Sequence, residues 1–174
     1  AALGIPATVV MPVTTPFVKV AATRGYGAEV VLDGETFAEA QLRAEQVASE
    51  RGLTWVHPYD DAKVIAGQGT IGLEMLDEAP DIEVLVVPIG GGGLVSGIAI
   101  AAKARRPDIE IVRAESALYA SFWHVPKGEH RPLGGATLAE GIAVKNVGRL
   151  TLPIVRELVS EIVLVDEVHI ERAV

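Results

Sequence analysis

Residues 86–97 read Val86-Val87-Pro88-Ile89-Gly90-Gly91-Gly92-Gly93-Leu94-Val95-Ser96-Gly97, an apolar strand that passes through four consecutive glycines into a helix. Without Cβ atoms the backbone can approach an anion closely, and the N–H groups of a helix N-terminus point toward it. A Cβ at Gly91 or Gly92 would stand where the anion sits. Because a flexible strand-to-helix turn needs fewer glycines, the run favours phosphate binding over such a turn.

The spacing within this loop excludes two nucleotide-binding motifs. A dinucleotide fingerprint needs glycines at i, i+2 and i+5, but Gly91 and Gly93 are followed by Ser96. A P-loop needs Gly-Lys-Ser/Thr, whereas Gly97 is followed by Ile98. The loop is therefore predicted to hold the single phosphate of a small cofactor.

Strands and helices alternate on both sides of the loop. We predict strands at residues 7–11, 29–32, 53–57, 84–87, 109–114 and 162–165, and helices at 14–26, 36–51, 64–73, 94–105 and 150–159. Their short connections indicate parallel sheets with right-handed crossovers, so the fold class is α/β. Residues 119–136 lack a periodic pattern and are predicted to form a long surface excursion.

Local signals place the ends of several helices. Thr14 or Thr15 is expected to cap the first helix, Thr36 to Glu39 forms a capping box, and Gly52 ends the helix that follows. Asp166 is expected to cap a last helix, which the end of the chain interrupts.

Two further features organise the middle of the chain. Gly67, Gly69 and Gly72 lie inside a predicted helix, where each costs about 1 kcal/mol relative to alanine, so another backbone or a ligand is expected close by. The Pro58–Lys63 stretch separates two series of strands and helices. The predicted lobes are a small lobe, residues 1–60, and a phosphate-binding large lobe, residues 61–174.

Composition narrows the classes of partner and compartment. The 174 residues carry a net charge of −8, which argues against nucleic acid or an anionic membrane as a partner. The absence of cysteine excludes disulfides, thiolate metal sites and a cysteine nucleophile. Residues 84–102 are uncharged, but their proline and glycines disfavour a membrane helix. Ala1 to Ile5 shows no signal peptide, and a cytoplasmic location is expected.

Three other stretches accompany the glycine loop. They are Leu3-Gly4-Ile5-Pro6-Ala7-Thr8-Val9-Val10-Met11-Pro12, then His57-Pro58-Tyr59-Asp60-Asp61 with Val64-Ile65-Ala66-Gly67-Gln68-Gly69-Thr70, and Leu138-Ala139-Glu140-Gly141-Ile142-Ala143-Val144-Lys145. Together with residues 87–94 they resemble fold-type-II pyridoxal-phosphate enzymes of the threonine dehydratase and serine racemase branch. The resemblance covers most of the chain and weakens across 119–135. It implies pyridoxal 5'-phosphate as cofactor and a tryptophan synthase β-like fold, with parallel sheets and helices on both faces.

The resemblance carries over a limited set of site residues. Gly90 to Gly93 with the backbone of Leu94 match the family's phosphate loop, and Gly141 matches a glycine beside the cofactor ring. Tyr59 follows His-Pro, where the dehydratases carry an aromatic residue and the racemase a polar one, so Tyr59 is a candidate substrate-pocket residue. A half-buried aromatic at a lobe hinge is the alternative interpretation of Tyr59.

Two expected chemical groups differ from the family's pattern. Glu115 ends a strand where the family's divalent-cation site takes a carboxylate, but the second carboxylate falls at Ser121, which puts that metal site in doubt. None of the five lysines has the sequence context of the family's Schiff-base lysine. We therefore assign no catalytic residue within this chain and expect it to be inactive alone.

By this resemblance the intact protein would be a threonine or serine dehydratase of amino-acid metabolism, catabolic or in isoleucine biosynthesis. It would eliminate the β-hydroxyl of the amino acid and yield a 2-oxo acid and ammonia. A homo-oligomer is expected of the intact protein. Serine racemase stays open as an alternative, as does a non-catalytic α/β module that binds a small phosphate ligand.

Overall fold

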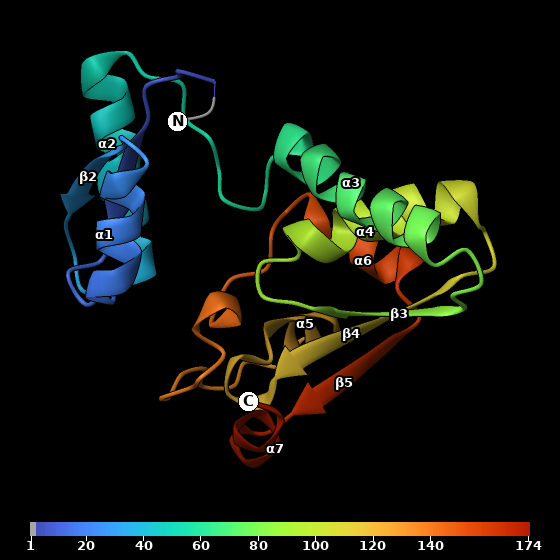
Figure 1. Cartoon of the computed structure of the whole chain (residues 1–174). Coiled ribbons are helices and arrows are strands. Elements are labelled where there is room, and N and C mark those ends of the chain that lie inside the picture. Colours follow the sequence, from blue (N-terminus) through green and yellow to red (C-terminus); the bar gives the residue numbers. More distant parts are fainter. Residues whose placement is uncertain (1–2) are drawn as a thin grey trace. The chain divides into compact units, whose positions relative to one another are not determined.

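The structure, a computed structural model, describes residues 3–174 and consists of two compact units, Ala1–Trp55 and Val56–Val174. Each unit contains a parallel sheet with helices between its strands (Figure 1). The predicted α/β class with parallel sheets is confirmed. The division between the units falls shortly before the predicted lobe boundary at residues 60 and 61.

The first unit is built on two parallel strands. β1 (Thr8–Met11) pairs with β2 (Glu29–Leu32) along its whole length. α1 (Phe17–Gly25) connects the two strands, and α2 (Phe37–Arg51) follows β2. The buried side chains of the two helices are few and aliphatic: Val20, Ala40, Val47 and Ala48.

Both ends of α2 form as the sequence predicts. The Thr36 hydroxyl accepts the N–H of Glu39 at 3.3 Å, and the Glu39 carboxylate accepts the N–H of Thr36 at 3.1 Å. Gly52 ends the helix in the left-handed conformation, with φ 63°. The helix therefore begins and ends on side-chain and backbone signals that are local in sequence.

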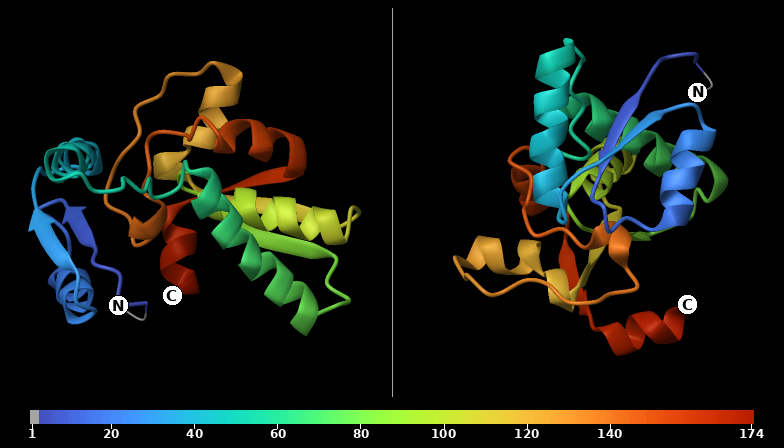
Figure 2. Two further views of the ribbon diagram at one scale, coloured as in Figure 1. Left: turned by 90° about the horizontal axis from the view of Figure 1, so that it is seen from above. Right: turned by 90° about the vertical axis from the view of Figure 1, so that its left-hand side faces the viewer.

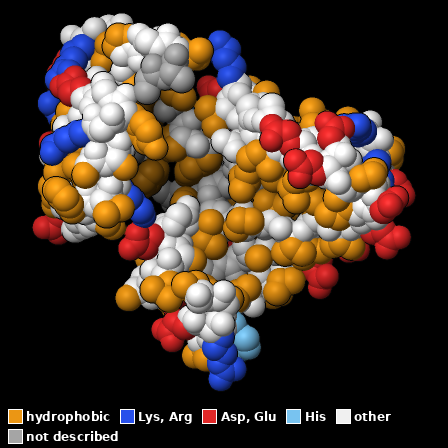
Figure 3. Space-filling view, in the orientation of Figure 1, with side chains coloured by type: hydrophobic (Ala, Val, Ile, Leu, Met, Phe, Trp, Pro, Cys, Tyr) orange, Lys and Arg blue, Asp and Glu red, His pale blue; other side chains and the backbone are white. Residues whose placement is uncertain are grey.

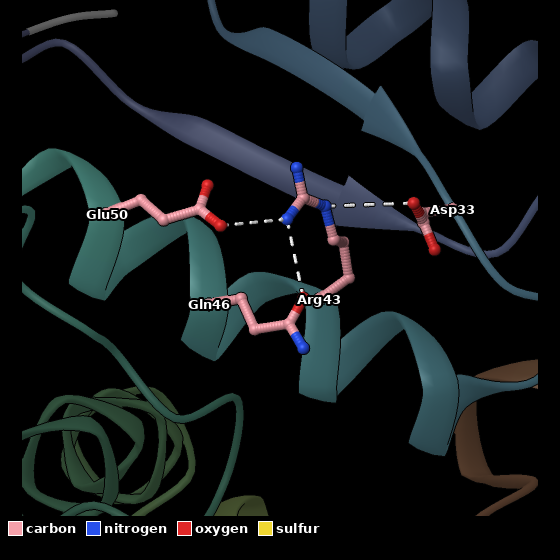
Figure 4. A network of polar contacts seen from close by, with 4 residues as sticks. All are labelled: Asp33, Arg43, Gln46 and Glu50. Atoms are coloured by element: carbon pink, nitrogen blue, oxygen red, sulfur yellow. Dashed lines mark hydrogen bonds and ion pairs between the residues drawn. The ribbon is translucent and has the colours of Figure 1, made fainter.

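Arg43 makes a polar network on α2 (Figure 4). Its guanidinium lies 3.7 Å from the Asp33 carboxylate and 3.4 Å from that of Glu50, and it donates to the Gln46 amide oxygen. Partly exposed ion pairs of this kind contribute about 0–1 kcal/mol each. The network consequently adds little beyond the caps and the buried face of the helix.

Two predictions in this part of the chain are wrong. Pro16, not Thr14 or Thr15, occupies the N-cap of α1, and the Thr14 hydroxyl donates instead to the Glu35 carbonyl at 3.2 Å. The predicted strand at 53–57 is an irregular connection. A strand needs a hydrogen-bonded neighbour, and no strand within residues 3–174 pairs with this stretch.

The second unit is a three-stranded parallel sheet in the order β3-β4-β5. β3 (Val84–Pro88), β4 (Glu110–Ser116) and β5 (Glu161–Val165) run side by side, and α3 (Ala62–Glu78), α4 (Gly93–Arg105) and α6 (Thr151–Leu158) lie over one face of the sheet (Figures 1 and 2). The core between them is aliphatic, with one aromatic ring. Its most deeply buried members are Leu85, Ile89, Val95, Ile109, Ile111, Phe122 and Val155.

The glycines of α3 let it approach α4 closely. A Cβ on Gly69 would lie 3.0 Å from the Gly97 carbonyl oxygen, and one on Gly72 would lie 3.2 Å from that of Ile98. The expectation that another backbone comes close is confirmed at these two positions. Gly67 differs, because a Cβ there would meet nothing within 4 Å.

The stretch predicted as a surface excursion is partly buried. It contains α5 (Ser121–His124), flanked by short 3-10 turns at Ala117–Tyr119 and Val125–Lys127. Ser121 and Phe122 are 0% and 1% exposed, so the surface prediction is wrong at these positions. A single apolar ring among glycines, prolines and histidines gives no periodic signal, although it enters the core.

The chain continues through a 3-10 turn at Glu140–Ile142 to the last helix, α7 (Glu167–Ala173). Asp166 caps α7 as predicted, because its carboxylate accepts the N–H of His169 at 2.9 Å. Along β3, Val84 and Val86 face outward, and Figure 3 shows hydrophobic side chains on the surface where this strand runs. Within residues 3–174, no helix combines the length and hydrophobicity needed to cross a bilayer.

Candidate functional site

The glycine loop joins β3 to α4 as the sequence predicts. Ile89 is still held to the sheet, since its N–H donates to the Ala114 carbonyl at 2.9 Å. Gly91, Gly92 and Gly93 are buried, and Gly92 is the N-cap of α4 with φ 93°. A side chain at Gly92 would be strained in this left-handed conformation.

The loop presents backbone donors that the protein does not use. Within residues 3–174, the N–H groups of Gly91, Gly92, Gly93 and Leu94 donate to no other group, and the first bond of the helix runs from Ser96 N–H to the Gly92 carbonyl at 3.0 Å. The buried Ser96 hydroxyl, in the first turn of α4, has no partner within the same residues. Unpaired N–H groups at the positive end of a helix dipole suit an anion.

Side chains of the protein, rather than empty space, surround the glycines. A Cβ on Gly91 would overlap the Tyr59 ring, and one on Gly93 would lie 2.8 Å from the Tyr59 carbonyl oxygen. A Cβ on Gly92 would meet Phe122 at 2.7 Å and Thr151 at 2.8 Å. The expectation that such a Cβ would occupy the anion's place is therefore corrected: it would first clash with the protein.

Tyr59 is a packing partner of the loop. Its hydroxyl donates to the Asn146 carbonyl at 3.1 Å, and its ring meets the His57 ring edge-on, with centroids 4.6 Å apart. The His57 Nδ1 accepts the N–H groups of Tyr59 at 3.2 Å and Asp60 at 2.8 Å, which fixes this turn. Burial, followed by the charge of Asp60, raises the pKa of the Tyr59 hydroxyl. A substrate-facing role for Tyr59 stays a prediction.

Sequence reasoning missed two residues that hold the loop. The Asp60 carboxylate accepts the N–H groups of Arg149 at 2.9 Å, Leu150 at 2.8 Å and Thr151 at 3.3 Å, at the start of α6. The Thr151 hydroxyl, fully buried, donates to the Gly91 carbonyl at 2.8 Å. The only sequence signal was the Asp60-Asp61 pair, which lies in the stretch predicted to separate the two lobes. Asp61 caps α3 by accepting the N–H of Lys63 at 2.8 Å.

The segment that carries Gly141 lies beside the loop. A Cβ on Gly90 would come within 3.0 Å of the Ile142 Cα and 3.1 Å of a Val144 methyl group. Gly141 itself has open space where its Cβ would be. Its position next to Ile142 is compatible with the expected place beside a cofactor ring, which stays a prediction.

Glu115 forms an internal helix cap. Its carboxylate is 1% exposed and accepts the N–H groups of Phe122 at 2.7 Å and Trp123 at 3.0 Å. The Ser121 hydroxyl lies 3.5 Å from the same carboxylate, so the two positions that the resemblance assigns to the family's cation site are adjacent. Burial raises the pKa of Glu115, and the two backbone N–H bonds oppose that shift. Within residues 3–174, no cluster of three His, Asp or Glu side chains suits a metal ion.

No lysine side chain is among the nearest neighbours of the positions where Cβ atoms would stand on Gly90 to Gly93, within residues 3–174. The atoms nearest to the positions of Cβ on Gly90 to Gly93 belong to Tyr59, Phe122, Ile142, Val144 and Thr151. The Lys103 ammonium donates to the Ile109 carbonyl at 2.8 Å, toward the far end of α4, and that of Lys127 lies 3.3 Å from the Trp123 ring centroid. The assignment of no catalytic lysine stays a prediction.

Comparisons with known proteins identify the family. The profile of the family described as "Pyridoxal-phosphate dependent enzyme" matches residues 1–174. The L-threonine ammonia-lyase of Geobacter sulfurreducens is 52% identical over 99% of this chain and 43% of its own length. The catabolic L-threonine dehydratase of Staphylococcus aureus is 49% identical over 98% of this chain and 50% of its own. The structure of maize serine racemase has a TM-score of 0.90 at 36% identity, over 99% of this chain and 53% of that one.

The profile match extends over the whole length of the chain, and the chain therefore belongs to the family of pyridoxal-phosphate dependent enzymes. The chain spans about half the length of the curated relatives it matches. The family's cofactor, pyridoxal 5'-phosphate, carries one phosphate. The unused N–H groups of the loop and the orphaned Ser96 hydroxyl fit that group.

Proposed function

We propose that this chain is the central part of an L-threonine dehydratase that depends on pyridoxal 5'-phosphate. The intact protein would convert L-threonine, or L-serine, into a 2-oxo acid and ammonia. Two relatives of about half-identical sequence bear the names L-threonine ammonia-lyase and L-threonine dehydratase. Their identity extends over nearly all of this chain, which supports a shared reaction.

The observation that carries this proposal is the glycine loop with its unused donors. The N–H groups of Gly91 to Leu94 would hold the phosphate, and the positive end of the α4 dipole would add to the attraction. Anchored there, the cofactor keeps a fixed orientation toward the bound amino acid. Orientation of this kind is the protein's main contribution to cofactor chemistry.

The cofactor supplies an electron-accepting ring that stabilises the charge left when the α-proton of the amino acid is removed. The chain's own residues would bind the cofactor's phosphate and keep water away from the loop. Tyr59 covers the loop beside Gly91 and restricts water there, and Ile142 and Val144 do so beside Gly90. No lysine of this chain is assigned a chemical step, so the attachment of the cofactor would come from elsewhere in the intact protein.

Serine racemase is the second candidate, favoured by the similarity to the maize enzyme's structure. We rank it below the dehydratase because an aromatic residue, Tyr59, follows His57-Pro58. A third possibility, a non-catalytic phosphate-binding module, ranks last because the three relatives described above all have enzyme names. We further propose that the large lobe binds the phosphate, that the intact enzyme is a cytoplasmic homo-oligomer, and that nucleic acid and membranes are not its partners.

An assay of the intact enzyme separates these candidates. The protein is incubated with pyridoxal phosphate and L-threonine or L-serine, and 2-oxo acid, ammonia and D-serine are measured. A dehydratase forms 2-oxo acid and ammonia in equal amounts. D-serine as the main product would instead identify a racemase. Phosphate binding without any turnover would leave only the binding module.

A further inference from the structure

We propose that Asp60 and Thr151 are positioning residues that set the direction of the glycine loop's N–H groups for phosphate binding. The inference deepens the proposed function and rests on it, because it concerns the same phosphate site. Neither side chain has to touch the cofactor. They act through the peptide group between Gly91 and Gly92.

The first step is the bond from Thr151 to the loop. Its hydroxyl donates to the Gly91 carbonyl at 2.8 Å, and the Thr151 side chain is fully buried. The carbonyl of Gly91 and the N–H of Gly92 belong to one planar trans peptide, in which they point in opposite directions. A hydroxyl that holds the carbonyl on one side therefore directs the Gly92 N–H to the other side. That N–H is among the donors that have no partner within residues 3–174.

The second step is the anchoring of Thr151 itself. The Asp60 Oδ1 accepts the N–H groups of Leu150 at 2.8 Å and Thr151 at 3.3 Å, and Oδ2 accepts that of Arg149 at 2.9 Å. One carboxylate thus holds three successive donors at the start of α6. A Cβ on Gly148 would overlap both the Asp60 carboxylate and the Thr151 hydroxyl, so this close packing requires glycine at position 148.

The position of Asp60 in the chain places this anchor directly after Tyr59. The ring and carbonyl of Tyr59 pack on Gly91 and Gly93. The same turn therefore contacts the loop directly through Tyr59 and indirectly through Asp60 and Thr151. Gly91 is consequently fixed from two sides, by a ring and by a hydrogen bond. A loop held in this way is ordered before the phosphate arrives, which lowers the entropic cost of binding.

The charge of Asp60 allows a positioning role to be distinguished from a purely electrostatic effect on phosphate affinity. A carboxylate close to an anion site repels the anion, so its removal alone would tighten phosphate binding. A positioning role predicts the reverse. Asp60→Asn keeps one acceptor oxygen but loses the other, and phosphate binding should weaken although a negative charge has been removed.

The experiment compares the affinity of the intact enzyme for pyridoxal phosphate with its affinity for pyridoxal, which lacks only the phosphate. Thr151→Val keeps the shape of the side chain and removes the hydroxyl. We expect it to weaken binding of pyridoxal phosphate roughly tenfold, the size of one buried hydrogen bond, and to leave pyridoxal binding unchanged. Thr151→Ser should restore the affinity. Asp60→Asn should weaken binding of the phosphate-bearing cofactor in the same selective way.

The control is Thr23→Val in α1, which removes a threonine hydroxyl that also donates to a carbonyl at 2.8 Å. It should change neither affinity. The inference would be overturned if Thr151→Val weakened the affinities for pyridoxal phosphate and pyridoxal equally. It would also be overturned if the variant bound pyridoxal phosphate within twofold of the wild-type affinity. Tighter phosphate binding in Asp60→Asn would do the same. If the wild-type protein does not bind pyridoxal phosphate, the proposed function itself is wrong.

Discussion

At the scale of single residues, we predict that Tyr59 influences the choice between elimination and racemisation. Its ring packs on Gly91, its hydroxyl donates to the Asn146 carbonyl, and its backbone turn is fixed by the His57 ring. A polar residue of smaller size at this position would open space beside the loop. If the substrate binds beside this loop, as proposed, water and a different hydrogen-bonding group would then be able to reach it.

The first prediction is a change of product in Tyr59→Asn. The smaller amide should admit water and a polar contact, so the ratio of 2-oxo acid to D-amino acid should fall severalfold. The measurement is the amount of each product from L-serine for wild type and variant. Tyr59→Phe is the matched control, since it keeps the ring and should keep the ratio. An unchanged ratio in Tyr59→Asn would reduce Tyr59 to packing.

The second prediction concerns alkaline pH. Because burial and Asp60 raise the pKa of Tyr59 in the folded protein, the unfolded chain deprotonates first, near pH 10. The stability that Tyr59 contributes is complete below about pH 10 and is lost as the pH rises toward the folded value. At pH 8, Tyr59→Phe should be about 1 kcal/mol less stable than wild type, from the lost bond to Asn146. Urea unfolding at pH 8 and 10.5 should show this difference shrinking; a constant difference would contradict it.

At the scale of elements, Glu115 connects β4 to the start of α5. Glu115→Ala would leave the buried N–H groups of Phe122 and Trp123 without an acceptor, a cost of about 1–3 kcal/mol each. Glu115→Gln retains an acceptor and avoids burying a charge, so it should cost much less. Denaturant unfolding at pH 7 gives both values. Equal stability of the two variants would contradict the capping role.

The Glu115 carboxylate also determines how strongly a divalent cation should bind at this position. Both its oxygens already accept backbone N–H groups, and Ser121 stands where a second carboxylate is expected, so Mg²⁺ and Ca²⁺ should bind only weakly. Calorimetry on the intact enzyme tests this directly. Micromolar binding that disappears in Glu115→Ala would show that the cation site exists.

The contact of α3 with α4 gives a prediction in which two glycines, each inside one of these helices, behave oppositely. A Cβ on Gly97 would overlap the Ile65 carbonyl and lie 2.7 Å from the Gly69 nitrogen, so Gly97→Ala should force the helices apart and cost several kcal/mol. Gly67→Ala has open space and should gain up to about 1 kcal/mol of helix propensity. Unfolding midpoints measure both. The idea fails if Gly97→Ala is as stable as wild type.

Local signals explain what could be predicted from the sequence. Thr36, Gly52 and Asp166 mark helix ends through neighbours a few residues away, and the run from Gly90 to Gly93 marks the loop. The strand expected at 53–57 does not form because, among residues 3–174, no strand pairs with its β-prone residues, and the sequence does not reveal this.

Distant contacts explain what could not be predicted. Asp60 binds residues 149–151 across about ninety positions. Either member of the Asp60-Asp61 pair has the chemistry of a helix cap. Only the fold assigns Asp61 to α3 and Asp60 to α6. The burial of Phe122 also depends on a contact that the sequence pattern does not show, because the Glu115 carboxylate accepts the Phe122 N–H.

At the scale of the whole molecule, two compact units divide the elements unequally. The second unit holds the glycine loop, its packing partners and the Asp60–Thr151 anchor, so all the described contacts of the candidate phosphate site lie within Val56–Val174. The phosphate site and the covalent attachment of the cofactor are separate requirements. A chain can satisfy the first without the second.

The last prediction follows from that separation: a protein of these 174 residues alone should have no dehydratase activity and no lysine covalently bound to the cofactor. Attachment needs a lysine amine held at the aldehyde. Lys103 is ten positions beyond Gly93, about 15 Å along α4 at 1.5 Å per residue, and its ammonium donates to the Ile109 carbonyl. Lys127 lies on the Trp123 ring. Borohydride reduction with pyridoxal phosphate, followed by peptide mapping, should therefore give only scattered, substoichiometric labels. One stoichiometric label on a single lysine, together with turnover of threonine, would place the missing chemistry within this chain.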